Sequence, residues 1–303
     1  MKPSCRLIIG ATGLIGRGLS KSFVDENTFF ISRNNKKNKI NKNHFFLDIN
    51  NKTEVTLFFK KLNARYKKVI VFFLAGESSV EDSIRKPEIS FIKSVQGFSN
   101  VISNVNRESK LIICSSGSLY DSRKKTYFKE TDSLFPPSPY SASKYAIEGL
   151  ALSYFESFGI DVRIARIFSV YGEDMNRFFI YDLIKKIKNN PAEVILNGSG
   201  NQFRDYLHVD DIVKGLKIIN SKGKPGEIYN LCSGKKTELK SLANDIKEIL
   251  KLEKTIISWD KNSYKGIRDS WYGDNSKIKK IGFISQDSKK SLKKTVEHIF
   301  LKI

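Results

Sequence analysis

Arg6-Leu-Ile-Ile-Gly10-Ala-Thr-Gly13-Leu-Ile-Gly16, near the N-terminus, joins a short apolar run to three regularly spaced glycines and then to a helical pattern. Glycines at such a junction permit a tight turn and a close approach of the backbone to a pyrophosphate, whose charge the helix N-terminus favours. A glycine pattern alone is weak, but here the strand, the spacing and the helix agree. The predicted site is a dinucleotide-binding turn whose contacts are Gly10, Gly13, Leu14, Ile15 and Gly16.

Beyond this turn, the first half of the chain alternates short runs rich in Ile, Val and Phe with longer amphipathic stretches. This alternation is typical of βαβ units and of a parallel sheet with both faces buried. We therefore predict an α/β fold, a Rossmann-type doubly wound parallel sheet. The predicted strands are 6–9, 28–31, 44–47, 69–74, 111–114 and 162–168, and the predicted helices between them include 86–106 and 141–158.

After residue 172 the pattern changes to helices, expected over 176–189, 210–220 and 238–250, with a strand over 227–232. This mixture predicts two domains. Residues 1–172 would form an NAD(P)-binding Rossmann domain with returning segments near 205–234, and residues 173–303 would form a smaller C-terminal substrate-binding domain. The cleft between the two is the expected site.

The composition indicates a folded protein, because 303 residues with 40% apolar and 12% aromatic content can bury a large core. The longest apolar run, 69–75, is too short to cross a membrane, and no signal-peptide pattern opens the chain. We therefore expect a soluble cytoplasmic protein without a membrane partner. The three dispersed cysteines favour reduced core thiols, and three histidines far apart in sequence give no support to a metal site.

The formal net charge of +21 raises the alternatives of a nucleic-acid partner or an acidic small substrate. Arginine, the residue that forks onto phosphates, accounts for only 12 of the 53 basic residues. The remaining lysines are scattered along the chain. We interpret them as solvated surface charge and expect no nucleic-acid partner.

The end of the second predicted strand bears on the choice of cofactor. An acidic residue there hydrogen-bonds the ribose of NAD, whereas a basic group accommodates the extra phosphate of NADP. This strand ends with Ser32 and Arg33 and carries no acid, so NADP(H) is favoured over NAD(H), unless Arg33 is one more surface cation. Asp48 and Ile49 follow the third strand, where Asp48 either accepts from the adenine amino group or caps the next helix.

Tyr140-Ser-Ala-Ser-Lys144 brings a phenol and an ammonium group to one helical face. Moving the tyrosine pKa from about 10 toward 7 requires about 4 kcal/mol of differential stabilisation, which a nearby lysine can contribute. Three Tyr/Lys pairs have this spacing, but only Tyr140 follows a proline-rich helix start, 24 residues after Ser116 at the mouth of a predicted strand. We therefore expect Ser116, Tyr140 and Lys144 to form a catalytic set in which Ser116 holds a substrate oxygen.

Several longer motifs occur in order, and on them the chain resembles the extended short-chain dehydrogenase/reductases, specifically the NAD-dependent epimerase/dehydratase family of sugar-nucleotide enzymes. The motifs include Leu74-Ala-Gly76, Cys114-Ser-Ser116-Gly-Ser-Leu-Tyr120, Arg166-Ile-Phe-Ser-Val-Tyr-Gly172 and Gly198-Ser-Gly-Asn-Gln-Phe-Arg204-Asp-Tyr-Leu-His-Val-Asp-Asp211. The resemblance implies hydride exchange, usually at carbon 4 of a nucleoside-diphosphate hexose, with Tyr140 moving the hydroxyl proton. Lys144 would bind the nicotinamide ribose and lower the pKa of Tyr140.

The resemblance also implies further contacts and a quaternary structure. Leu74, Ala75 and Gly76 would line the cofactor, and Arg204 would grip the substrate diphosphate, with Arg268 as an approximate match for a second arginine. His208 would be structural. Ser78, Ser118 and Ser169 would contact the substrate. The helices 86–106 and 141–158 would form a homodimer interface, unless their apolar positions all face the sheet.

Gly117 and Ser118 stand where the 4,6-dehydratases of this family carry an acid pair. Elimination of water would lack its acid and base, so dehydration is disfavoured. We expect a 4-keto reductase, with a nucleotide-sugar 4-epimerase as the alternative. A nonenzymatic nucleotide-binding regulator is the alternative of another class. Surface polysaccharide synthesis is the usual setting of such enzymes.

Overall fold

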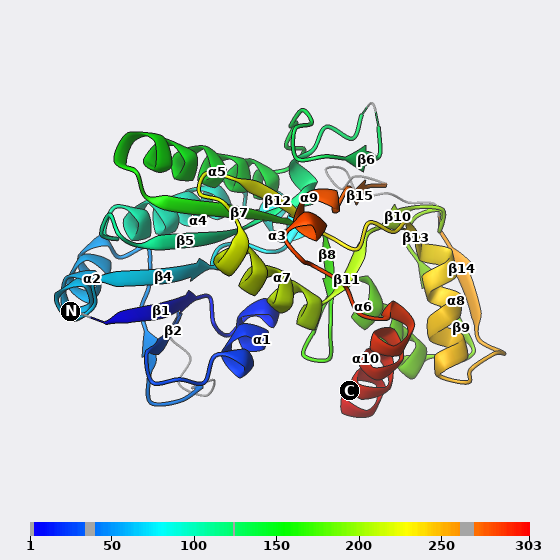
Figure 1. Cartoon of the computed structure of the whole chain (residues 1–303). Coiled ribbons are helices and arrows are strands. Elements are labelled where there is room, and N and C mark those ends of the chain that lie inside the picture. The colour runs from blue at the N-terminus through cyan, green and yellow to red at the C-terminus, as the bar shows by residue number, and fades with distance from the viewer. Residues whose placement is uncertain (1–2, 34–39, 124, 261–269) are drawn as a thin grey trace.

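The computed structural model describes residues 3–33, 40–123, 125–260 and 270–303. Its centre is a parallel sheet, seven-stranded within the described chain, in the order β12-β7-β5-β4-β1-β2-β3 (Figure 1). The chain runs outward from β1 through β2 and β3 and then restarts at β4 on the other side of β1. This order confirms the doubly wound prediction and puts the switch point between β1 and β4. The strands are β1 (Ser4–Ile9), β2 (Thr28–Ser32), β3 (His44–Phe46), β4 (Lys68–Phe73), β5 (Lys110–Ser116), β7 (Asp161–Ile167) and β12 (Ile228–Leu231).

Helices cover both faces of this sheet because successive strand residues point to opposite sides. On one face Leu7 and Ile9 of β1 pack with Phe98 and Ile147, and on the other Ile8 packs with Leu19 and Ile212. The first layer comprises α2 (Lys52–Arg65), α3 (Val80–Arg85), α4 (Pro87–Ile102) and α5 (Pro139–Phe158). The second comprises α1 (Leu14–Ser22), α7 (Val209–Lys222) and α9 (Ser276–Lys280).

A smaller group of elements lies beyond the ends toward which the strands point (Figure 1). It has a separate apolar core that includes Leu183, Leu242 and Val296. The helices are α6 (Phe179–Asn189), α8 (Leu239–Ile249) and α10 (Ser288–Lys302), beside the paired strands β9 (Glu193–Leu196) and β14 (Ile256–Trp259). Further short pairs are β8 (Ser169–Tyr171) with β11 (Tyr206–His208), β10 (Phe203–Arg204) with β13 (Thr237–Glu238), and β6 (Tyr127–Phe128) with β15 (Tyr272–Gly273).

Two helix boundaries differ from the sequence prediction by three residues or more. Helix α4 ends at Ile102, before the predicted end at residue 106, because the Asn104 and Asn106 side chains hydrogen-bond backbone carbonyls in a turn. Helix α6 begins at Phe179, three residues later than predicted, because Phe178 has a φ of 74°, outside helical geometry.

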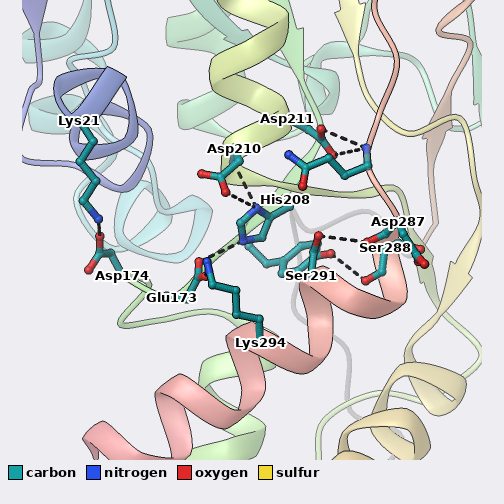
Figure 2. A network of polar contacts seen from close by, with 12 residues as sticks. Lys21, Glu173, Asp174, His208, Asp210, Asp211, Asp287, Ser288, Ser291 and Lys294 are labelled. Atoms are coloured by element: carbon teal, nitrogen blue, oxygen red, sulfur yellow. Dashed lines mark hydrogen bonds and ion pairs between the residues drawn. The ribbon is translucent and has the colours of Figure 1, made fainter. Parts of the chain in front are cut away.

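A polar joint connects α1, α7 and α10 through two adjacent acids (Figure 2). Glu173 pairs with His208 Nε2 at 3.0 Å and with Lys294 Nζ at 2.6 Å, and Asp174 pairs with Lys21 Nζ at 2.8 Å. His208 is buried, and its Nδ1 accepts from the Asp210 N–H as the N-cap of α7. His208 therefore connects the N-terminus of α7 to Glu173, which agrees with the structural role expected for this histidine.

All three cysteines are free and buried, which confirms the prediction of core thiols. Burial raises the pKa of the Cys5 and Cys114 thiols to about 12, so both are inert at neutral pH. Over the described ranges, none of the helices combines the length and apolar character needed to cross a membrane.

Candidate active site

The glycine turn between β1 and α1 has the shape that a dinucleotide phosphate requires. Gly10 has a φ of 93°, and a Cβ there would lie 2.9 Å from the backbone nitrogen of Ala75. A Cβ at Gly16 would lie 2.2 Å from the Gly10 carbonyl oxygen. Gly13 is the exposed N-cap of α1 and brings no side chain to cap it. The N–H groups of the first turn of α1 are therefore available to bind an anion. The glycine turn thus fits the pyrophosphate of a dinucleotide.

Leu74, Ala75 and Gly76 follow β4 and lie against this turn. The Leu74 N–H donates to the Ile9 carbonyl at 2.9 Å, which ties the end of β4 to that of β1. Gly76 is exposed and has a φ of 118°. Leu14 and Ile15 in the first turn of α1 are half-buried against neighbouring apolar clusters. The predicted cofactor contacts at 10–16 and 74–76 therefore share one edge of the sheet.

The end of β2 presents hydrogen-bond donors and no carboxylate. Ser32 is buried, with its Oγ 2.8 Å from His44 Nε2. Because the Ile40 N–H donates to His44 Nδ1, the neutral ring carries its proton on Nε2 and donates to Ser32. The serine keeps its own hydrogen to donate elsewhere. Arg33 is exposed immediately after the strand.

Asp48 does not cap the helix that follows it. The N-cap of α2 is Asn51, whose side chain accepts from the Glu54 N–H at 3.2 Å. Asp48 is exposed, and its carboxylate accepts from the Asn50 N–H at 3.0 Å. The capping alternative is therefore wrong, and the adenine contact stays a prediction. The Ile49 side chain is buried in the core, which limits its reach toward a ligand.

Ser116, Tyr140 and Lys144 come together at the carboxyl end of β5. Ser116 is the last residue of the strand, and Tyr140 is the second residue of α5, which Ser138 caps and Pro139 begins. One turn later, Lys144 Nζ donates to the Cys114 carbonyl at 3.2 Å and lies 5.9 Å from the centre of the Tyr140 ring. A Cβ on Gly76 would be 3.9 Å from the same Nζ. The set therefore borders the predicted cofactor edge.

Burial shifts both members of the Tyr140/Lys144 pair toward their neutral forms. It raises the pKa of Tyr140, against the lowering influence of the Ser116 hydroxyl. Burial also lowers the pKa of Lys144, and Cys114 and Glu148 oppose this shift by raising that pKa. Desolvation outweighs the influences that lower the Tyr140 pKa, and the Lys144 ammonium group donates to a backbone carbonyl, so the lowering by Lys144 stays a prediction.

A buried ion pair lies behind Lys144. Glu148, one turn further along α5, meets Arg166 of β7 at 2.7 Å, and both side chains are almost fully buried. Arg166 also lies 4.9 Å from the Tyr120 ring centre. Tyr120 itself is buried and donates to Asn230 at 2.6 Å, which gives it a structural setting distinct from that of Tyr140.

The sequence did not predict a role for Arg177. It precedes the positive-φ residue Phe178 and donates to the Ser78 hydroxyl, which brings that predicted substrate residue to the loop before α6. Its charge lowers the pKa of Tyr140, whereas Glu77, also missed, raises it. Arg177 lies in an irregular loop, so neither periodicity nor motif spacing signals its position.

Arg204 and Ser169 lie at a second focus. The Arg204 guanidinium is 3.9 Å from the Trp271 ring centre and donates to the Phe203 carbonyl. The Ser169 N–H donates to the carbonyl of Asp205, whose buried carboxylate accepts from Ser233, Gly234 and Gly273. Arg268 lies outside the residues that the structure describes.

The model of the NAD dependent epimerase/dehydratase family matches residues 6–232. A dTDP-glucose 4,6-dehydratase of Streptomyces griseus is 30% identical over 70% of this chain and 66% of its own. A UDP-glucuronate 4-epimerase of Thermodesulfobacterium geofontis is 30% identical over 73% of this chain and 69% of its own. The chain spans 55 to 66% of the length of four of the dTDP-glucose 4,6-dehydratases that it matches.

A solved UDP-glucose 4-epimerase with UDP-glucose, from Thermotoga maritima, has the same fold, with a TM-score of 0.85 at 25% identity over 98% of this chain and 99% of that one. The matched region contains the glycine turn, the carboxyl end of β5 and the start of α5. The chain therefore belongs to the NAD-dependent epimerase/dehydratase family, as an extended short-chain dehydrogenase/reductase.

Proposed function

We propose that the protein is an NADP(H)-dependent reductase of a nucleoside-diphosphate 4-keto hexose. The observation that carries this choice is the end of β2, where Ser32 and Arg33 replace the carboxylate that would accept from an NAD ribose. Both side chains offer donors, and a 2′-phosphate offers only acceptors at neutral pH. Hydrogen bonds from these side chains to the phosphate would be charge-assisted, and charge-assisted hydrogen bonds are stronger than neutral ones.

The protonation state of Tyr140 suits the reduction of a ketone, and it suits the ketone-reducing half of an epimerase equally. Burial raises the pKa of this phenol, so it carries its proton at neutral pH. Reduction of a ketone requires a proton donor at the carbonyl oxygen, and a bound nicotinamide supplies the hydride. Tyr140 gives the proton, Ser116 holds the oxygen, and Lys144 with the glycine turn and 74–76 holds the cofactor.

The space around Gly117 argues against dehydration. A Cβ at this position would lie 2.8 Å from the Phe168 ring, so an acidic side chain has no room there. The next residue, Ser118, uses its hydroxyl on Ser116 and Ser141. Neither position can supply the carboxyl group that removal of water at neighbouring carbons requires.

A nucleotide-sugar 4-epimerase is the second candidate, favoured by the similarity to the Thermodesulfobacterium geofontis enzyme. An epimerase uses the same tyrosine in both directions, but it keeps its nicotinamide bound and consumes no reductant. Net consumption of cofactor therefore separates the two candidates.

The test is made on purified protein freed of nucleotide. Titration with NADPH and NADH, followed by nicotinamide fluorescence, is expected to show NADPH binding at least about tenfold more tightly, because hydrogen bonds to a charged group contribute about 1.5–3 kcal/mol. UDP- or dTDP-linked 4-keto-6-deoxyhexoses are then added. We expect one NADPH to be oxidised for each sugar nucleotide that is reduced. Tighter NADH with interconversion of UDP-glucose and UDP-galactose would establish the epimerase instead. Tight cofactor binding without turnover of any sugar nucleotide would support the nonenzymatic regulator.

A further inference from the structure

Four serine hydroxyls form a continuous hydrogen-bonded chain that ends at the candidate catalytic set. Ser138 Oγ lies 3.0 Å from Ser141 Oγ, which lies 2.9 Å from Ser118 Oγ, which lies 2.9 Å from Ser116 Oγ. Ser138 and Ser116 are buried, Ser141 is fully buried, and Ser118 is half-buried. The chain therefore runs from the N-cap of α5 to the last residue of β5, largely away from water.

The direction of these hydrogen bonds follows from the donor inventory. A hydroxyl group has one hydrogen and two acceptor sites. Ser138 Oγ accepts from the Ser141 N–H as the helix cap, and within the described residues its hydrogen has one acceptor in reach, Ser141 Oγ. Ser138 thus donates to Ser141, and Ser141 must donate onward to Ser118.

At the far end, Ser116 is saturated as an acceptor. Its Oγ receives the Ser118 N–H at 3.2 Å and the Ser118 hydroxyl at 2.9 Å. Both acceptor sites are filled, so Ser116 cannot accept from a phenol or an alcohol in the site. Its own hydrogen is the group left to face Tyr140 and the substrate oxygen.

We propose that Ser138, Ser141 and Ser118 are positioning residues that fix Ser116 as a hydrogen-bond donor, which preorganises the site for a ketone oxygen or a developing oxyanion. The inference rests on the proposed function and extends it, because a reductase must hold a carbonyl and a carbonyl only accepts. Hydrogen bonds in series also polarise one another, which strengthens the final donor.

The groups around Tyr140 set the background for any pH test. Glu77 and Cys114 raise its pKa and Arg177 lowers it, while Lys144 Nζ lies 5.9 Å from the ring centre. Ser116 donation stabilises the phenolate and so lowers the pKa. Reversal of the chain removes that donation and raises the pKa.

The experiment reverses the direction of the serine hydrogen bonds by a substitution at Ser138, the serine farthest from Ser116 in the series. Asp is an N-cap as good as Ser, but a carboxylate only accepts, so Ser138→Asp forces Ser141, Ser118 and Ser116 to donate back toward the cap. We expect the pKa of Tyr140 to rise by about one from the loss of donation, a tenfold change in the phenolate equilibrium. We also expect kcat for ketone reduction to fall about tenfold with NADPH affinity unchanged. Ser138→Asn keeps both the cap and a donor and should behave like the wild type.

A double-mutant cycle separates the chain from the simple charge of the new carboxylate. In a Ser141→Ala background the carboxylate introduced at position 138 keeps its charge. Without the Ser141 hydroxyl, however, it cannot reverse the direction of the hydrogen bonds at Ser118 and Ser116. The rise in the Tyr140 pKa caused by Ser138→Asp should therefore be smaller by about one in that background. Equal rises in both backgrounds would overturn the proposal. Ser143→Ala, which removes a buried hydroxyl outside the chain on the same helix, is the matched control.

Two readouts keep this test separate from that of the proposed function. The Tyr140 titration is followed by tyrosinate absorbance, as the difference between each protein and its Tyr140→Phe counterpart, and needs no substrate. If no sugar nucleotide is reduced, the reductase assignment fails while the titration still decides the serine chain. Thermal unfolding identifies any variant that fails to fold, and the cycle then uses Ser118→Ala in place of Ser141→Ala.

Discussion

At the scale of single residues, the proposed function depends most on Tyr140. We expect Tyr140→Phe to abolish turnover because the substrate oxygen loses its proton donor, while affinity for NADPH stays within about twofold. Tyr145→Phe, which alters an exposed ring on the same helix, is the matched control and should retain activity. Steady-state kinetics and fluorescence titration of both variants check this. Unimpaired turnover by Tyr140→Phe would contradict the assignment.

Arg33 carries the expected preference for NADP(H). Arg33→Asp should weaken NADPH binding at least about tenfold and strengthen NADH binding, because an acceptor replaces a donor at the ribose. Lys61→Asp makes the same charge change on exposed α2 and should leave both affinities alone. Competitive titration with the two nucleotides provides the measurement, and an unchanged ratio would remove Arg33 from the site.

At the scale of elements, the joint of α1, α7 and α10 predicts a pH-dependent stability. Burial alone would raise the pKa of Glu173, but Lys294 and His208 lower it to about 2 from an ordinary 4.5. A lowered carboxyl pKa stabilises the fold above its unfolded value, and the contribution is lost as the pH falls from about 4.5 toward 2. The ion pair is partly exposed at Lys294, so we expect about 1 kcal/mol.

Glu173→Gln tests that contribution by urea unfolding. The free energy of unfolding should fall by about 1 kcal/mol at pH 7 and by much less at pH 3, where the wild type has lost most of the same contribution. Lys294→Met should reproduce the loss, whereas Lys293→Met, whose partner Glu297 lies 3.9 Å away on the surface, should not. An equal loss at both pH values would show that Glu173 acts through packing and not through its charge.

How far the sequence leads depends on whether a feature is local. The strands of the parallel sheet follow from apolar runs bounded by turns, and the glycine turn and the Tyr140/Lys144 pair lie within single elements, so all were predictable. Arg177 and Glu77 approach Tyr140 only through tertiary contacts between loops, which no spacing rule encodes. The net rise of the Tyr140 pKa also could not be predicted, because it depends on burial in the folded chain.

At the scale of the whole molecule, an exposed apolar surface on α3, α4 and α5 supports the expected homodimer. Its members include Ile84, Ile89, Phe91, Ile92 and Tyr145, each more than a third exposed. The three helices pack against one another, and monomeric proteins rarely leave a large apolar patch in water. We expect Ile89→Lys with Ile92→Lys to give a monomer by light scattering, because buried unpaired charges oppose association. Val24→Lys, at an exposed site elsewhere, is the control, and a monomeric wild type would contradict the prediction.

The edge of β7 against which β12 packs has a consequence for synthesis on the ribosome. Some 60 residues separate β7 from its partner strand, and at about 5–20 residues per second they take roughly 3–12 s to emerge. During that interval the strand edge stays unpaired, and the sheet face stays open until α7 emerges late in the interval and α9 after it. The nascent chain thus has a defined window in which ribosome-associated chaperones or aggregation compete for it, and the sheet that is begun first is completed only after part of the second group of elements has emerged.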